Sequence, residues 1–152
     1  MSTTHPIFEL GDVMRITPKA VEAMQALKVG AASPTLSAEL CELVKLRCSQ
    51  LNECAFCVHI HSRDARAKGE TQERLDMLPV WRESSLFTPR EKAALAWAEA
   101  LTRLGDADLA AVRDEVGTVL DDADLLHLAW VIVHINGWNR IARSFRFTPG
   151  AR

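Results

Sequence analysis

The stretch that most restricts how this chain can fold lies within residues 42–69 and contains the pattern C-x-x-C-x-x-x-H. The residues of this pattern are Cys54, Cys57 and His61. In an α-helix, residues three, four and seven positions apart lie on one stripe of the surface. The spacing therefore predicts a helix over about 54–68 that starts at the cysteines and carries the histidine one turn further along.

The first turn of such a helix favours redox chemistry at the two cysteines. Thiols three residues apart can close a disulfide, and the free N–H groups and positive dipole end there favour the thiolate. Lowering a thiol pKa from about 8.5 to about 6.5 would ionise most of the thiol at neutral pH. His61 could then hold or relay a proton, whereas His59 lies off the stripe and is a weaker candidate.

Composition and charge exclude several classes of protein. The chain has 152 residues, 48% apolar and 25% charged, which predicts one globular domain over residues 1–152. A net charge of −2 with both signs interspersed argues against nucleic-acid binding. No apolar run reaches about 18 residues, and the N-terminus lacks the pattern of a secretion signal. We therefore expect a cytoplasmic protein without a membrane segment.

Helix-start and helix-stop signals predict an all-α fold. Thr88 and Glu91 form a capping box with Pro89 at the first helical position, which is the strongest start signal in the chain. No segment alternates apolar and polar residues as a strand would. We expect an irregular lead-in at 1–16 and six to seven helices, over about 17–28, 37–51, 54–68, 71–78, 88–104, 107–116 and 121–145.

The last of these helices is apolar on all sides between Leu125 and Ile135. Such a helix belongs in a core or in a subunit interface, so it favours a homo-oligomer. We expect Gly137 to interrupt it, because glycine weakens a helix interior.

Other residues of reactive type fit structural roles. Cys41 and Cys48 are seven residues apart on the apolar face of the predicted helix 37–51, which favours buried, inert thiols. His127 and His134 on the last helix fit core positions with one satisfied nitrogen. Packing is likewise favoured for two tryptophans, and helix capping for the acidic run: Trp130, Trp138, Asp121, Asp122 and Asp124.

Glu42 is a candidate on which position and periodicity disagree. If the helices on either side of Asn52 pack antiparallel, Glu42 lies about 15 Å from the turn and His61 lies at a similar depth, so the two could pair. On a helical wheel, however, Glu42 lies opposite the apolar stripe, near Lys45 and Ser49. That placement alone predicts a solvated face.

The combined spacing resembles the alkylhydroperoxidase D / carboxymuconolactone decarboxylase family: Glu42, twelve residues to Cys54, C-x-x-C, then three residues to His61. Segments at 70–75, 81–82 and 135–140 also resemble its small single-domain members. In Cys-containing members, such residues form a peroxidatic site with a proton relay. The resemblance implies that Cys57 attacks, Cys54 resolves, and Glu42 with His61 relays protons.

The resemblance also implies what the protein works with. The expected substrate is a small-molecule hydroperoxide, and an external dithiol or thiol protein is the expected reductant. No cofactor and no metal are expected, and the assembly expected is a homo-oligomer, a trimer or a hexamer. From the residues alone the attacking cysteine stays open, because Cys54 is nearer the helix start and Cys57 is nearer His61.

Three alternatives remain from the sequence. Zinc could be bound by Cys54, Cys57, His61 and one of His59, Cys48 or Glu42, although no second C-x-x-C or H-x-x-x-H pair is present. The second is a lyase of the carboxymuconolactone decarboxylase type. The resemblance implies that members of that branch work without the C-x-x-C, so its presence here points away from them. The third is a redox sensor that is oxidised without turnover.

Overall fold

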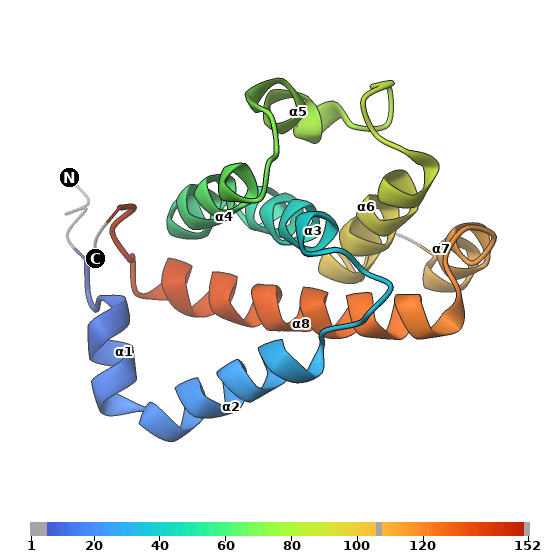
Figure 1. The fold of residues 1–152 in the computed structure, drawn as a ribbon. Helices are drawn as coiled ribbons and strands as arrows, with labels where there is room; N and C mark the ends of the chain where they lie inside the picture. Colours follow the sequence, from blue (N-terminus) through green and yellow to red (C-terminus); the bar gives the residue numbers. More distant parts are fainter. Residues whose placement is uncertain (1–5, 106–107, 151–152) are drawn as a thin grey trace.

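A computed structural model describes residues 6–105 and 108–150, and these residues form an all-α fold (Figure 1). They contain eight α-helices, one 3-10 helix and no strand. The α-helices are α1 (Leu10–Ile16), α2 (Pro18–Gly30), α3 (Ala38–Leu51), α4 (Ala55–Ala67), α5 (Gln72–Met77), α6 (Pro89–Thr102), α7 (Leu109–Val116) and α8 (Asp122–Ser144), and the 3-10 helix η1 (Leu78–Val80) follows α5.

Four of the predicted helix starts are confirmed by their capping bonds, whereas Thr17 precedes α2 without a side-chain capping bond. The side chains of Ser37, Thr71 and Asp121 each accept a hydrogen bond from a backbone N–H in the first turn of α3, α5 and α8. Thr88 and Glu91 form the predicted capping box of α6. These local bonds satisfy backbone groups that a helix end would otherwise leave unpaired.

The structure differs from the prediction of six to seven helices in two places: an additional helix forms near the N-terminus, and α8 continues through Gly137. Part of the expected irregular lead-in forms α1, whose start is a capping box between Glu9 and Asp12, with both partners bonded. Gly137 does not interrupt α8, because α2 packs there: a Cβ on Gly137 would lie 3.2 Å from Met24 Cε. Residues 1–5 of the lead-in and the predicted helix start at Ala107 lie outside the described residues.

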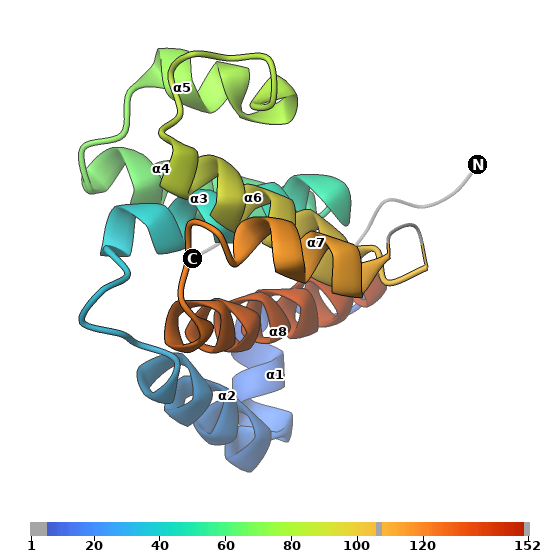
Figure 2. The same ribbon diagram turned by 90° about the vertical axis from the view of Figure 1, so that its right-hand side faces the viewer.

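Helix α3 lies at the centre of the fold, in contact with α4, α6 and α8 (Figures 1 and 2). Helix α8 separates the α3 and α4 pair from an arm formed by α1 and α2 (Figures 1 and 2). The main core gathers apolar side chains from α3, α6 and α8, including Val44, Ala94, Leu128, Ile132 and Ile135. This packing holds α3 rigidly, and α3 carries the residues of the candidate site.

The sequence suggested that helix α8 is buried on all sides, but in the single chain one side of it is exposed. Leu128 and Ile132 are buried, but Leu126, Trp130 and Val133 are 61%, 47% and 51% exposed. Trp130 is therefore not a core residue of the single chain. Within the described residues, no helix combines the length and apolar character needed to cross a membrane.

Candidate active site

The candidate site is built on the helical hairpin of α3 and α4. The chain turns at Asn52 and Glu53, where Glu53 adopts a left-handed backbone with φ of 53°. Cys54 follows as the N-cap residue of α4, and its backbone N–H donates to the Ser49 carbonyl. The prediction that the cysteine pair starts a helix is confirmed.

Polar side chains of α8 tie this turn in place. Asn52 Nδ2 donates to Asn136 Oδ1 at 2.6 Å and to Asn139 Oδ1 at 2.8 Å. Asn139, which is 1% exposed, in turn donates to Ser49 Oγ. Buried and fully bonded polar groups resist displacement, because breaking one bond leaves its partner unsatisfied. The network therefore holds the turn that carries Cys54 against α8.

Cys54 and Cys57 form a disulfide across the first turn of α4, with their Cα atoms 5.3 Å apart. The two residues are only 2% and 4% exposed. The Cys57 backbone N–H donates to Cys54 Sγ at 3.3 Å, so this sulfur replaces the usual oxygen of an N-cap. After reduction, the same N–H would stabilise a Cys54 thiolate.

Glu42 and His61 meet across the hairpin, at the depth that the turn predicts. Glu42 Oε2 lies 2.8 Å from His61 Nδ1. The prediction of a solvated face from periodicity is wrong, because Glu42 is 6% exposed and Lys45 is 8% exposed. Helices α2 and α8 enclose this face of α3 with Lys28 and His134, so the polar stripe lines a cavity instead of the protein surface.

The charge state of Glu42 follows from its partners. Burial opposes its ionisation, yet hydrogen bonds from His61 and Lys45, together with the Lys45 charge, lower the pKa of its carboxyl to about 2. Glu42 is thus ionised at neutral pH and accepts the proton of His61 Nδ1. The other ring nitrogen, Nε2, is left to exchange a proton elsewhere.

A cavity of about 320 Å³ joins these groups. Cys57, Glu42 and His61 line it, whereas Cys54 does not. Much of its wall is apolar and comes from the α1 and α2 arm, α4 and α8: Leu10, Met14, Val21, Phe56, Ile60, Ile135 and Trp138. A small organic molecule could therefore reach the sulfur of Cys57 through a largely apolar space next to a charged pair.

Two features of this cavity were missed from the sequence. Lys45 donates to Glu42 Oε1 at 3.0 Å, and its position three residues from Glu42 was the available signal for that pair. His134 lines the cavity as well, and its Nε2 accepts a hydrogen bond from Trp138 Nε1 at 3.2 Å. The prediction of a core histidine with one satisfied nitrogen describes His134 correctly but misses the cavity beside it.

The remaining reactive side chains lie outside this arrangement. Cys48 is fully buried, which raises the pKa of its thiol to about 12, as expected for an inert cysteine. Cys41 is only partly buried. His59 is exposed, and His127 Nδ1 lies 3.3 Å from the Ala31 carbonyl.

The residues that could hold a metal are few. Across residues 6–105 and 108–150, a single group qualifies: ligand atoms of Glu42, His61 and Asp64 lie within 4.8 Å of one another. Lys45 and Lys68 place ammonium groups 3.0 and 3.9 Å from Glu42 Oε1, which opposes a further cation. The disulfide also engages both sulfurs that the zinc hypothesis needs as thiolates.

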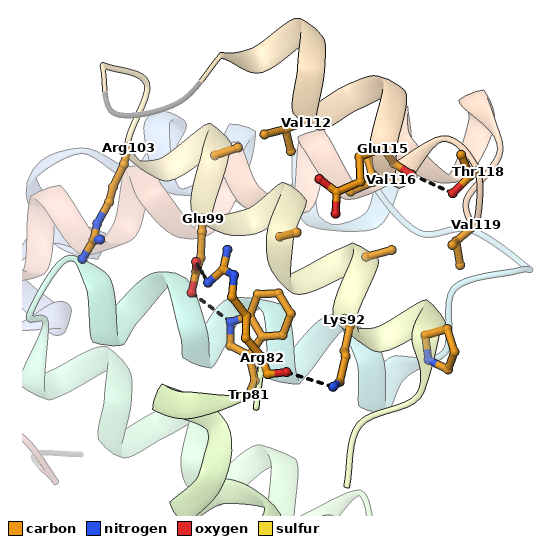
Figure 3. Close-up of a pocket in the computed structure, with 14 residues that line it drawn as sticks. Trp81, Arg82, Lys92, Glu99, Arg103, Val112, Glu115, Val116, Thr118 and Val119 are labelled. Atoms are coloured by element: carbon orange, nitrogen blue, oxygen red, sulfur yellow. Dashed lines mark hydrogen bonds and ion pairs between the residues drawn. The ribbon is translucent and has the colours of Figure 1, made fainter. Parts of the chain in front are cut away.

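A larger cavity lies elsewhere in the fold, away from the cysteines. It measures about 540 Å³ and lies among η1, α6 and α7, with Trp81, Glu99 and Val116 in its wall (Figure 3). None of the four predicted site residues lines it. It holds no cysteine or histidine, so size alone is a poor guide to where the chemistry takes place.

The chain is similar to known proteins over most of its length. Residues 18–100 match the model of the carboxymuconolactone decarboxylase family. The uncharacterized protein YdfG of Bacillus subtilis (strain 168) is 35% identical over 132 residues, which cover 84% of this chain and 87% of YdfG.

Two solved structures share the fold. A protein of unknown function from Agrobacterium tumefaciens, whose description names the antioxidant defence protein AhpD, superposes with a TM-score of 0.86 and 30% identity over 97% of this chain and 100% of that one. An uncharacterized peroxidase-related protein from Silicibacter sp. superposes with a TM-score of 0.78 and 23% identity, covering 89% and 72%. At that lower identity the likeness shows the fold alone. The chain belongs to the carboxymuconolactone decarboxylase family.

Proposed function

We propose that this protein is a thiol-dependent peroxidase that reduces a small organic hydroperoxide. One observation carries the proposal: Cys57, half of a disulfide at a helix start, opens on the same cavity as the hydrogen-bonded pair of Glu42 and His61. The pair supplies proton transfer and the cysteines supply a two-electron couple. The structural relative described by reference to AhpD supports the same reaction.

The first step takes place at Cys57. Its thiolate attacks the terminal oxygen of the hydroperoxide, so that an S–O bond forms while the O–O bond breaks. The departing alkoxide receives a proton from His61 and leaves as an alcohol. Glu42 keeps the imidazole oriented through the hydrogen bond to Nδ1, so that Nε2 can accept the thiol proton beforehand.

The second step restores the disulfide of the structure. The Cys54 thiolate attacks the sulfur of the Cys57 sulfenic acid, and the hydroxyl group leaves as water after taking up a proton. The backbone N–H of Cys57 stabilises the Cys54 thiolate for this role. An external dithiol or thiol protein then reduces the disulfide by exchange. Such a cycle needs a reducing compartment, so we place the protein in the cytoplasm.

The test is an intact-mass and free-thiol measurement on reduced, metal-free protein after one equivalent of an organic hydroperoxide. We expect a rapid loss of about two mass units from the native chain, because two thiols lose two hydrogens. Cys54→Ser should accumulate a sulfenic acid that dimedone traps, and Cys57→Ser should not. The reverse pattern would make Cys54 the attacking residue.

Failure of the peroxidase proposal is equally clear in this measurement. If both thiols stay reduced over minutes, the hydroperoxide is not a substrate. The better hypothesis for the function is then a lyase that uses Glu42 and His61 without the cysteines. If the thiols oxidise once but excess dithiol gives no turnover, the protein is a redox sensor. Zinc bound to the reduced protein, measured by elemental analysis, would instead support a metal site at the cysteines.

We also propose that the chain forms a homo-oligomer, either a trimer or a hexamer. The stripe of Leu126, Trp130 and Val133 on α8 leaves three large apolar side chains in water in the single chain, which a subunit interface would cover. Native mass spectrometry should show an assembly that Trp130→Glu converts to monomers. A monomeric native chain would contradict this proposal.

A further inference from the structure

A second cavity adjoins the cysteine cavity and differs from it in charge. It measures about 420 Å³ and shares five lining residues with the cysteine cavity: Lys28, Glu42, Lys45, Asp64 and His134. Lys68 lines the second cavity only. The two cavities thus share most of their charged groups; the first adds Cys57 and a largely apolar wall, and the second adds the ammonium group of Lys68.

The ammonium groups outnumber the carboxylates in this second cavity. Lys28, Lys45 and Lys68 contribute three positive charges, against the two negative charges of Glu42 and Asp64. Both carboxylates are already engaged, since Glu42 pairs with Lys45 and His61 and lies 3.9 Å from the Lys68 ammonium group, and Asp64 pairs with Arg63 at 2.8 Å. Within the described part of the chain, Lys28 has no carboxylate within ion-pair distance.

His134 adds a neutral hydrogen-bond donor to the same space. The Trp138 indole can only donate, so His134 Nε2 must be unprotonated, and the neutral ring carries its proton on Nδ1. Burial, together with the charges of Lys45 and Lys28, lowers the pKa of His134 to about 4, which keeps the ring neutral at pH 7. No described residue accepts a hydrogen bond from Nδ1, and none of the fully buried side-chain polar atoms in the described residues lacks a partner, so Nδ1 is not fully buried, and His134 itself lines this cavity.

We propose that this second cavity is an anion subsite, which takes the carboxylate of an amphipathic hydroperoxide while the hydroperoxyl group reaches Cys57 in the first cavity. Lys28 and Lys68 supply the attraction, and His134 Nδ1–H supplies a directed hydrogen bond. The excess of one positive charge matches a monoanion. The substrate assignment rests on the peroxidase function proposed above, but the subsite itself does not.

A matched pair of substrates tests the assignment. Cumene hydroperoxide and its 4-carboxylate differ by one carboxylate, and the ratio of their kcat/KM values isolates its effect. At low ionic strength we expect the native protein to favour the carboxylate about tenfold. The double variant Lys28→Gln, Lys68→Gln should bring the ratio close to one, and Lys19→Gln, an exposed lysine on the same α2 helix, should leave the ratio at its native value.

A binding measurement separates the subsite from the reaction. Titration of the oxidised protein with 4-isopropylbenzoate by calorimetry should show binding that the double variant weakens about tenfold. If neither hydroperoxide oxidises the dithiol but the benzoate binds in this way, the peroxidase function fails and the subsite stands.

Three results would overturn the subsite. The first is a native kcat/KM ratio of one or below, and the second is a ratio that the double variant does not change. The third is inorganic phosphate binding at these lysines while the benzoate does not bind, which would replace the carboxylate with another anion.

Discussion

Two largely buried carboxylates, Glu42 on α3 and Glu99 on α6, invite comparison, because both lie in a cavity wall and both have a lowered pKa. Glu42 is bound by His61 and Lys45. Burial opposes the ionisation of Glu99 on α6, but hydrogen bonds from Trp81, Arg82 and Arg47 lower its pKa. Figure 3 shows Glu99 with Trp81 and Arg82. An indole and two guanidinium groups do not exchange protons at neutral pH, whereas an imidazole does. Glu99 therefore joins η1, α3 and α6, and Glu42 can serve a proton relay.

The comparison teaches that burial and a lowered pKa do not identify a functional carboxylate. Both acids share these properties, and the Glu99 cavity is the larger one. What distinguishes Glu42 is a titratable partner next to a nucleophile in the same space. The predictions below test that distinction.

The largest expected effect is on turnover. Glu42→Gln should lower kcat/KM for an organic hydroperoxide by about 100-fold or more, because the relay loses the charge that orients and stabilises His61. Glu99→Gln should stay within about twofold of the native value. A steady-state assay with excess dithiol measures both, and unchanged turnover in Glu42→Gln would remove this residue from the mechanism.

Stability should not separate the two carboxylates. Glu99→Gln leaves Arg47, whose side chain is 13% exposed, beside a neutral partner, and Glu42→Gln does the same to Lys45, whose side chain is 11% exposed. Each substitution should cost about 2–3 kcal/mol of unfolding free energy. Urea unfolding of the two variants measures both losses, and a negligible loss in either variant would show that its ion pair does not stabilise the fold.

Acid should reveal the stabilisation supplied by Glu42. Its pKa falls from an ordinary value of 4.5 to about 2 in the folded chain, so the ionised carboxylate stabilises the fold fully above pH 4.5. That contribution is lost as the pH falls towards 2. The difference in unfolding free energy between the native chain and Glu42→Gln should therefore shrink from pH 6 to pH 2.5, and a constant difference would contradict it.

The smallest effect concerns Cys48, a thiol on α3 that borders neither the Glu42 nor the Glu99 cavity. Its raised pKa, a result of complete burial, predicts that iodoacetamide labels it far more slowly than the two reduced cysteines of α4. Cys48→Ala should change turnover less than about twofold. Rapid labelling at Cys48 in folded protein, mapped by peptide mass, would show that α3 is less tightly packed than described.

The helical fold was predicted well from the sequence because the signals that start and end helices are local. Caps such as Ser37 and Thr88 act within one turn, so their residues identify them directly. The break expected at Gly137 was wrong for a tertiary reason: the glycine makes room for Met24 of α2. The helix α1 was missed because it is short and its start uses Glu9, an unusual cap residue.

The candidate site was predictable only in part. Cys54, Cys57 and His61 belong to one helix and its N-cap, so periodicity alone could place them together. The position of Glu42 required the family resemblance, because a polar stripe on α3 looks the same whether it faces water or a cavity. The contributions of Lys28 and His134 come from α2 and α8, and no local pattern could have brought them to this cavity.

The α3 and α4 hairpin also limits how this chain can vary. Glu42 and His61 meet because each lies a set number of residues from the turn at Asn52 and Glu53. Inserting one residue between Glu42 and the turn would swing the carboxylate by about 100° and move it by about 1.5 Å along the helix axis. A substitution in this interval leaves that spacing unchanged. Among active relatives with this hairpin, we therefore expect the number of residues between the acid and the histidine to tolerate far less change than their identity.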